Sequence, residues 1–268
     1  MKLESFSAAA IDRDEVADSE GRGARAKSLG KVGLVLDSFT RKKPVMTVAE
    51  LAAATGMPKT TVHRIVSSLR DIGMLDQDGR RQGYRLGLRL FHYGNSVLAS
   101  LETSKRAHPH VARLQQITGE VIHFHLFDGS QMVCVEREEM ASSTLTTLLT
   151  APIYCTGVGK AFLAFQEMAL VKKVISEGLH RLTANTITTE AALLAELEKV
   201  RRLGYAVDNE ENDIGVKCVG APVSDARGRV FAAVSVSAPV ERMPETRVQG
   251  LAPIVIQTAV ALSRSLSE

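Results

Sequence analysis

The sequence contains no tryptophan, and only 4% of its 268 residues are aromatic. It also lacks any run of 18 or more apolar residues, so it offers no candidate membrane span, and we expect no membrane among its partners. Its first twenty residues carry acidic side chains where a signal peptide would have an apolar stretch. We therefore expect a cytoplasmic protein.

Cysteine is scarce as well. Cys134, Cys155 and Cys218 are odd in number and far apart, without a CxxC pair, which excludes a disulfide framework and a zinc knuckle. His123 and His125 would alternate onto one face of a strand, with Cys134 nearby, and such a cluster could bind a metal. Because no clear third and fourth ligand follows, we predict structural or pocket histidines, no metal site and no cofactor.

The net charge of +3 is distributed unevenly along the chain. Residues 22–89 hold fourteen basic and five acidic side chains, whereas residues 1–21 carry a net charge of −4 and residues 90–268 one of −2. A basic segment of domain size indicates a polyanion binder, because neutralising phosphates supplies much of nucleic-acid affinity. The length and the 45% hydrophobic content suffice for two folded units.

Residues 1–27 show no sustained apolar period and are expected to form a flexible tail. From Ser28, a suitable N-cap, apolar residues recur at spacings of three and four, which predicts a first helix. Thr47 and Glu50 form a capping box that starts a second, short helix, and this helix ends at Thr55-Gly56.

A third helix is predicted from Pro58 to Gly73, with one apolar stripe made by Val62, Ile65, Val66 and Leu69. A helix that enters a major groove needs such a stripe to fix it and an opposite face of hydrogen-bond donors. The candidate DNA-binding residues of this helix are Lys59, Thr60, Thr61, His63, Arg64 and Ser67. Among them, Arg64 could pair bidentately with a guanine.

Two short strands around a basic turn follow the third helix and predict a wing. Its candidate DNA-binding residues are Arg80, Arg81 and Arg85. Residues 28–86 are thus predicted to be a winged helix-turn-helix, and residues 87–103 a linker helix whose apolar excess indicates contact with another chain.

Residues 104–268 are predicted to be an α/β domain. We expect one helix that ends at Ile117-Thr118-Gly119, another from Thr188 to Arg202, and a last one that starts at Pro253. The predicted strands are VIHFHLF, QMVCVERE, GYAVD, VKCVGAPVS and VFAAVSVSA.

The stretch TVAELAAATGMPKTTVHRIVSSL, followed by GYRLG, resembles the DNA-binding domain of the IclR family of bacterial regulators. TGEVIHFHL, GVGKAFLAF and the segment from TITTE to SVSAP resemble its effector domain, so the resemblance covers residues 28–268. It implies an α+β fold with an N-terminal winged helix-turn-helix, a linker helix and a C-terminal GAF-like effector-binding domain with a curved antiparallel sheet. It also implies homodimers or homotetramers built as dimers of dimers.

The resemblance further implies an effector pocket, whose matching positions here are Gly157, Val158, Asp208, Val216, Cys218, Ser235 and Ser237. Gly157 and Val158 precede a helix, so their N–H groups can receive a carboxylate, and Ser235 and Ser237 alternate onto one strand face. We therefore expect a small organic acid as effector. The loop from Ser143 to Tyr154 leaves its size and aromatic character open.

The expected function is that of a transcriptional regulator, repressor or activator, whose affinity for a palindromic operator responds to this effector. GVGKA lacks the outer residues of a phosphate-binding loop, since Tyr154 and Ala161 stand at those positions. One alternative is a hydrolase in which Cys218, Asp208 and a histidine assemble a nucleophile and base. Another is an interaction module that has no preferred DNA.

Overall fold

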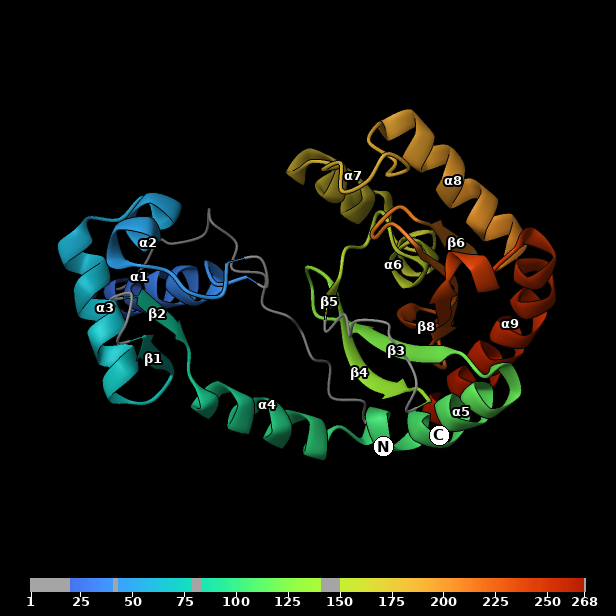
Figure 1. The fold of residues 1–268 in the computed structure, drawn as a ribbon, viewed down its shortest axis with the longest axis horizontal. Helices are drawn as coiled ribbons and strands as arrows, with labels where there is room; N and C mark the ends of the chain where they lie inside the picture. Colours follow the sequence, from blue (N-terminus) through green and yellow to red (C-terminus); the bar gives the residue numbers. More distant parts are fainter. Residues whose placement is uncertain (1–19, 41–42, 79–82, 141–149, 268) are drawn as a thin grey trace. The chain divides into compact units, whose positions relative to one another are not determined.

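The computed structural model describes residues 20–40, 43–78, 83–140 and 150–267. Within these residues the chain divides into two compact units, residues 20–100 and residues 101–267 (Figure 1). None of the described helices combines the length and the apolar character needed to cross a membrane.

The N-terminal unit places three helices and a hairpin around one small core. Its elements are α1 (Glu20–Asp37), α2 (Val48–Thr55), α3 (Lys59–Asp71), β1 (Leu75–Asp78), β2 (Gly83–Leu86) and α4 (Leu88–Ser100). Leu51, Val62 and Val66 are fully buried at its centre. Tyr84 of β2 also exchanges two backbone hydrogen bonds with Met46, of 2.7 and 2.9 Å, which tie the hairpin to the segment before α2.

Helix α1 begins at Glu20, so the predicted start at Ser28 is wrong by eight residues. The sequence of residues 24–27, Ala-Arg-Ala-Lys, consists of strong helix formers, which can extend a helix backwards from a packed segment. Residues 1–19 of the predicted tail lie outside the described residues.

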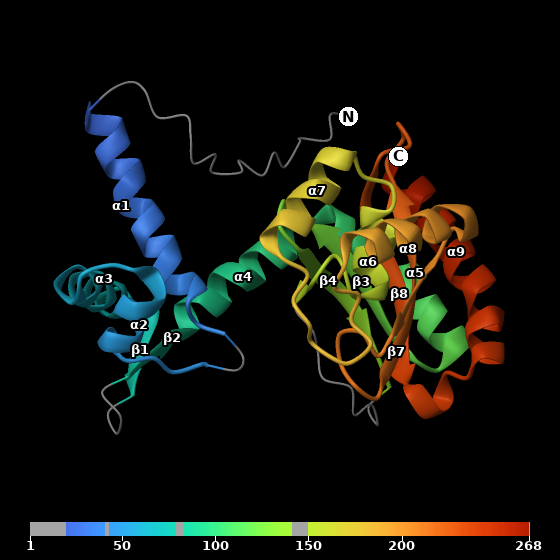
Figure 2. The same cartoon turned by 90° about the horizontal axis from the view of Figure 1, so that it is seen from above.

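The C-terminal unit is built on a six-stranded antiparallel sheet of order β5-β4-β3-β8-β7-β6. Helices cover both faces of this sheet, as the view in Figure 2 shows. The strands are β3 (Val121–Phe127), β4 (Met132–Glu138), β5 (Thr150–Ala151), β6 (Ala206–Asn209), β7 (Val216–Ser224) and β8 (Val230–Pro239).

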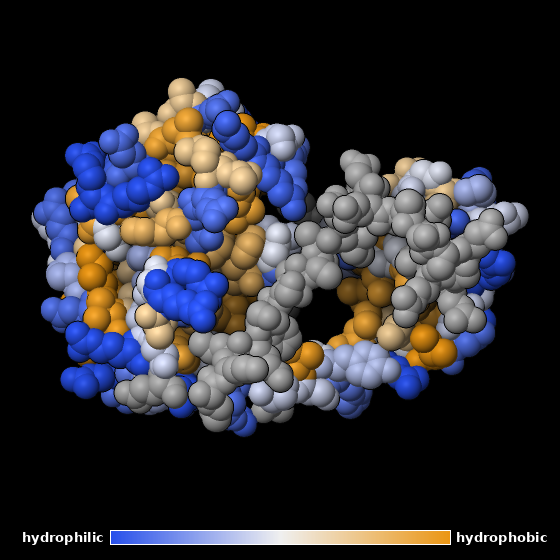
Figure 3. Space-filling view, turned by 180° about the vertical axis from the view of Figure 1, so that it is seen from behind, coloured by the Kyte–Doolittle hydropathy of each residue, from blue (hydrophilic) through white to orange (hydrophobic). Residues whose placement is uncertain are grey.

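Two long helices, α5 (Glu102–Thr118) and α9 (Glu245–Ser267), cover one face of the sheet. The other face carries α6 (Gly157–Leu163), α7 (Met168–Glu177) and α8 (Glu190–Leu203). Successive side chains of β8 point to opposite faces of the sheet and therefore belong to different cores. Val234 packs with α5 and α9, and Ala233 packs with α6 and α8. On the coloured part of the face that Figure 3 shows, hydrophilic and hydrophobic residues lie interspersed.

The last helix does not start at Pro253 as predicted, because Pro253 lies inside α9. A proline in a helix removes one backbone hydrogen bond and usually kinks or ends the helix. Here Pro253 is exposed, while Val248, Leu251 and Val255 on the inner side are buried against the sheet. The packing of this apolar stripe against the sheet keeps α9 helical on both sides of Pro253.

Candidate functional site

Helix α3 presents its apolar stripe to the core and its polar residues to solvent. Val62, Val66 and Leu69 are buried, as predicted, and Ile65 is half-buried against the same core. Among the predicted DNA-binding residues, Lys59, Thr60, His63 and Arg64 are exposed, and Thr61 and Ser67 are half-buried. The exposed donors of Lys59, His63 and Arg64 therefore form one polar face.

The start of α2 carries the capping box that the sequence predicts. The Thr47 hydroxyl accepts from the backbone N–H of Glu50, and the Glu50 carboxylate accepts from the backbone N–H of Thr47 over 2.8 Å. The hydrogen bond from the Thr47 backbone N–H, Lys43 at 3.1 Å and the bond from the Thr47 hydroxyl lower the pKa of the Glu50 carboxyl to about 2. At the other end of α2, Gly56 is left-handed at φ 68° and forms the turn between α2 and α3.

The wing is only partly described. Arg85 of β2 is exposed and lies 3.9 Å from a carboxylate oxygen of Asp76 on β1. Arg80 and Arg81 lie outside the described residues.

Six of the seven predicted effector residues line one small cavity of about 30 Å³ in the C-terminal unit. Val216 is the exception, because it stands at the outer end of β7 opposite Pro239. The cavity is bordered by the start of α6 and by strands β3, β5, β6, β7 and β8, and its lining consists of His123, His125, Ala151, Thr156, Gly157, Val158, Asp208, Cys218, Ser235 and Ser237.

The sheet register explains why residues distant in sequence meet at this cavity. Cys218 of β7 pairs with Asp208 on one side and with Ser237 on the other. Ser235 of β8 pairs in turn with His123 of β3. Directly opposed residues of antiparallel strands point to the same face, so these side chains converge.

The start of α6 lies very close to β7. A Cβ atom on Gly220 would lie 2.6 Å from the carbonyl carbon and oxygen of Gly157, so only glycine permits this approach. Thr156 caps the helix by accepting from the N–H of Gly159 over 3.0 Å. The capped N–H of Gly159 is therefore already engaged inside the protein, while Gly157 and Val158 line the cavity.

Two histidines complete the cavity; the sequence predicted them as structural or pocket residues, but the family resemblance did not place them among the effector positions. His123 and His125 are buried, and Nε2 of His123 and both ring nitrogens of His125 have no hydrogen-bond partner among the described residues. Burial lowers the pKa of His123 to about 4 and that of His125 to about 3, so both rings are neutral at pH 7. The available signal was a pair of polar residues alternating in the otherwise apolar strand VIHFHLF.

The sequence raised a metal cluster of these histidines with Cys134 but favoured structural or pocket histidines over it. Cys134 lies on β4 opposite His125 but outside the cavity lining. In the part of the chain that the structure describes, the group with suitable spacing for a metal is instead His108, Glu136 and Glu138.

Asp208 and Cys218 have strongly shifted acidities in this cavity. Burial raises the pKa of Asp208 to about 7, although the backbone N–H of Glu211 donates to its carboxylate over 2.8 Å. Burial also raises the pKa of the Cys218 thiol, and the nearby Asp208 adds to this effect. A thiol nucleophile needs a lowered pKa, so Cys218 is unsuited to the hydrolase that the sequence left open.

A helix-turn-helix whose exposed polar face stands on α3, joined to an α+β domain with a small polar cavity, is the architecture of a ligand-responsive DNA-binding regulator. The family model described as "Bacterial transcriptional regulator IclR C-terminal" matches residues 95–264. The model described as "IclR helix-turn-helix domain" matches residues 28–79. The chain belongs to the IclR family of bacterial transcriptional regulators.

Similar proteins agree with this assignment. The DNA-binding transcriptional repressor YiaJ of Escherichia coli is 31% identical over 260 residues, which are 94% of this chain and 92% of that protein. The crystal structure of Thermotoga maritima IclR, 29% identical, matches with a TM-score of 0.64 and covers 92% of this chain and 100% of its own. The named relatives are transcriptional regulators, so this chain is a regulator and not an enzyme.

A third match shares the fold. The structure of an IclR homologue from Microbacterium hydrocarbonoxydans, complexed with 4-hydroxybenzoate, is 24% identical with a TM-score of 0.68. It covers 89% of this chain and 98% of its own.

Proposed function

We propose that the protein controls transcription by binding a palindromic operator with an affinity that depends on a small carboxylate-bearing effector. In this proposal residues 28–86 bind DNA, residues 87–103 link the domains, and residues 104–268 bind the effector. The observation that carries it is the convergence of Asp208, Cys218, Ser235 and Ser237 on one cavity with two histidines, of which Nε2 of His123 and both ring nitrogens of His125 have no partner among the described residues.

The chemistry of the cavity favours a small acid. A neutral imidazole carries one N–H donor and one acceptor, so His123 and His125 can donate to a carboxylate without a charge of their own. The hydroxyl of Ser235 offers a further donor from β8, whereas the Ser237 hydroxyl already shares a hydrogen bond of 3.3 Å with Nδ1 of His123. The 4-hydroxybenzoate in the Microbacterium homologue is also a carboxylate, which supports the same ligand class here.

On the DNA, α3 would lie in the major groove. Arg64 would read a base edge, while Lys59, Thr60 and Thr61 near the helix start would contact phosphates, with His63 and Ser67 on the same face. Arg80, Arg81 and Arg85 of the wing would hold the backbone. These contacts predict a strong dependence of affinity on salt.

Helix α4 suggests how two chains would associate. Leu88, Phe91, Tyr93 and Val97 are exposed by 75%, 65%, 46% and 54%, an unusual share of apolar surface on one helix. We propose that α4 contacts a second copy, which would bring two α3 helices to successive major grooves of a palindrome.

The experiment is a selection of binding sites from random DNA, followed by titration of small acids against the selected site. We expect a palindromic site whose affinity changes with one acid, and we expect Ser235→Ala with Ser237→Ala to weaken that response while leaving acid-free DNA binding intact. Selection of unrelated sequences would contradict operator recognition. A selected site that ignores every acid, while thermal shifts also show no acid binding, would contradict the effector.

A further inference from the structure

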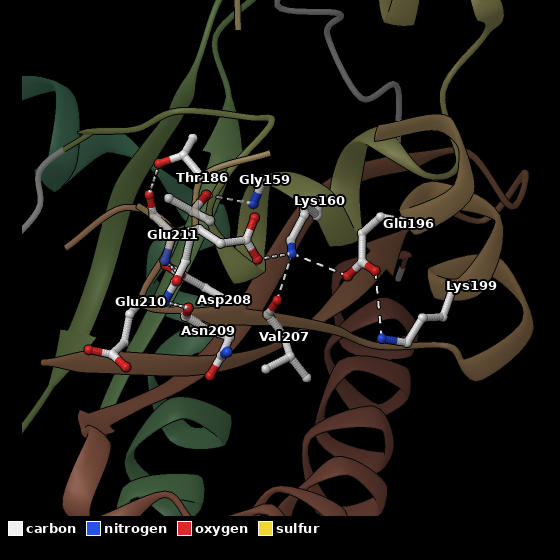
Figure 4. Close-up of polar contacts among 12 residues, drawn as sticks. Gly159, Lys160, Thr186, Glu196, Lys199, Val207, Asp208, Asn209, Glu210 and Glu211 are labelled. Carbon is white, nitrogen blue, oxygen red and sulfur yellow. Dashed lines mark hydrogen bonds and ion pairs between the residues drawn. The ribbon is translucent and has the colours of Figure 1, made fainter. Parts of the chain in front are cut away.

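Lys160 of α6 is a fully buried cation with partners on three other segments. Its ammonium donates to the backbone carbonyl of Val207 over 2.6 Å and to Glu196 of α8 over 3.2 Å, and it is also bonded to the carboxylate of Glu211 (Figure 4). Its side chain is only 1% exposed. A buried ammonium is costly unless it is well paired, so the arrangement depends on all these contacts.

The partners of Lys160 stand on either side of Asp208 in the chain. Lys160 binds Val207 just before Asp208 and Glu211 three residues after it. The backbone N–H of Glu211 in turn donates to the Asp208 carboxylate over 2.8 Å. Lys160 does not line the cavity itself, so it contacts Asp208 only through these neighbours, although its charge also lowers the pKa of the Asp208 carboxyl.

Strand β6 separates two hollow regions. Asp208 lines the effector cavity, whereas Val207 and Asn209 line a groove of about 540 Å³ that also contains Glu196 and Glu211. This division follows from the alternation of side chains along a strand. The ion cluster around Lys160 therefore lies at the wall between cavity and groove.

This wall is the part of the cavity best placed to move. A cavity of about 30 Å³ has room for about one water molecule, so a larger effector must displace part of the lining. Strand β6 is at the edge of the sheet and is paired only with β7 in the part of the chain that the structure describes. The groove leaves space behind it.

We propose that Lys160 is a positioning residue of the effector cavity: through Val207 and Glu211 it holds β6 closed with Asp208 toward the cavity, and it thereby sets how readily the cavity opens. The name effector cavity rests on the proposed function, but the opening itself does not depend on any effector.

The test uses the full chain and the thiol of Cys218, which lines the cavity. Lys160→Met and the wild type are treated with N-ethylmaleimide, and modification is followed at each cysteine by peptide mass spectrometry. We expect Cys218 to react roughly tenfold faster in Lys160→Met, because a looser wall opens more often. Cys134, which is outside the cavity lining, serves as internal reference and should react unchanged.

Lys199→Met is the matched control, because the exposed Lys199 contacts Glu196 at 3.6 Å, and Figure 4 draws no contact from it to Val207 or Glu211. It should leave Cys218 labelling at the wild-type rate. Lys160→Arg, which keeps the charge and can bind the same oxygens, should restore labelling toward that rate. Loss of core stability alone would not produce this restored, site-specific protection.

Should Lys160→Met fail to fold, the double variant Lys160→Met with Glu211→Gln removes both buried charges together and takes its place. Wild-type labelling of Cys218 in a folded Lys160 variant overturns the proposal, as does equal acceleration at Cys134. If the wild type binds no acid at all, the proposed function fails, whereas the labelling result still decides the role of Lys160.

Discussion

Asp208 and Cys218 are register partners across strands β6 and β7, and both line the same cavity. Burial raises the pKa of both groups, and it lowers the pKa of His123 and His125 on the neighbouring strand. At pH 7 the lining therefore has few full charges, and Asp208, with a pKa of about 7, is the group that titrates there.

The pH dependence of stability should reveal this carboxyl. Since the folded pKa of Asp208 is raised from 3.8 to about 7, its contribution to the free energy of unfolding is complete below pH 3.8 and is lost as the pH rises to about 7. Asparagine does not ionise, so Asp208→Asn does not lose this free energy of unfolding as the pH rises. Between pH 4 and 7 the free energy of unfolding of the variant should rise relative to that of the wild type by a few kcal/mol. The reason is that one proton linked to folding changes this free energy by about 1.4 kcal/mol per pH unit.

Urea unfolding of both proteins at a series of pH values measures the difference. The two histidines titrate alike in both chains, so their opposite pH dependence cancels. A constant difference across this range would show that Asp208 ionises normally.

The contact of α6 with β7 should make Gly220→Ala destabilising. Its Cβ atom would lie 2.6 Å from the Gly157 carbonyl, and overpacking of this kind typically costs about 1–3 kcal/mol. Gly250→Ala in α9 is the control, because no described atom lies within 4 Å of its Cβ position and alanine favours a helix by up to about 1 kcal/mol. Thermal unfolding should move the two variants in opposite directions, and a shared direction would argue against the close approach.

The exposed face of α3 should separate base reading from phosphate binding. Arg64→Ala is expected to relax base preference at one position by about 1–3 kcal/mol, whereas Arg81→Ala should weaken all sequences alike and reduce the salt slope by roughly one. Arg70 is bonded to Asp71 and Gln77 at the far end of α3, so Arg70→Ala serves as control. Fluorescence anisotropy measures the affinity of each variant for the selected operator and for scrambled DNA. Equal effects of Arg64→Ala and Arg81→Ala on these affinities would contradict the assignment.

Helix α4 should control association of two chains. Phe91→Glu places a charge on a side chain that is 65% exposed in the single chain, so it should shift sedimentation velocity toward the monomer without lowering the thermal stability of each domain. Asn95→Glu adds the same charge at an exposed polar position of this helix. Dimers that survive Phe91→Glu as well as Asn95→Glu would remove α4 from the interface.

The sequence by itself determined the local features. The Thr47–Glu50 cap, the stripe of α3 and the strand segments involve residues a few positions apart, whose periodicity is visible in one dimension. The α6 glycines and the Asp208 segment could be matched to an effector pocket only through the family resemblance.

Tertiary structure decided the rest. The order β3-β8-β7-β6 brings His123, Ser235, Cys218 and Asp208 to one cavity and leaves Val216 outside it, and no spacing in the sequence encodes this order. Burial then shifts the pKa values there. Packing against the sheet carries α9 through Pro253, and Lys160 becomes a buried cation only because α8 and the segment after β6 supply its partners.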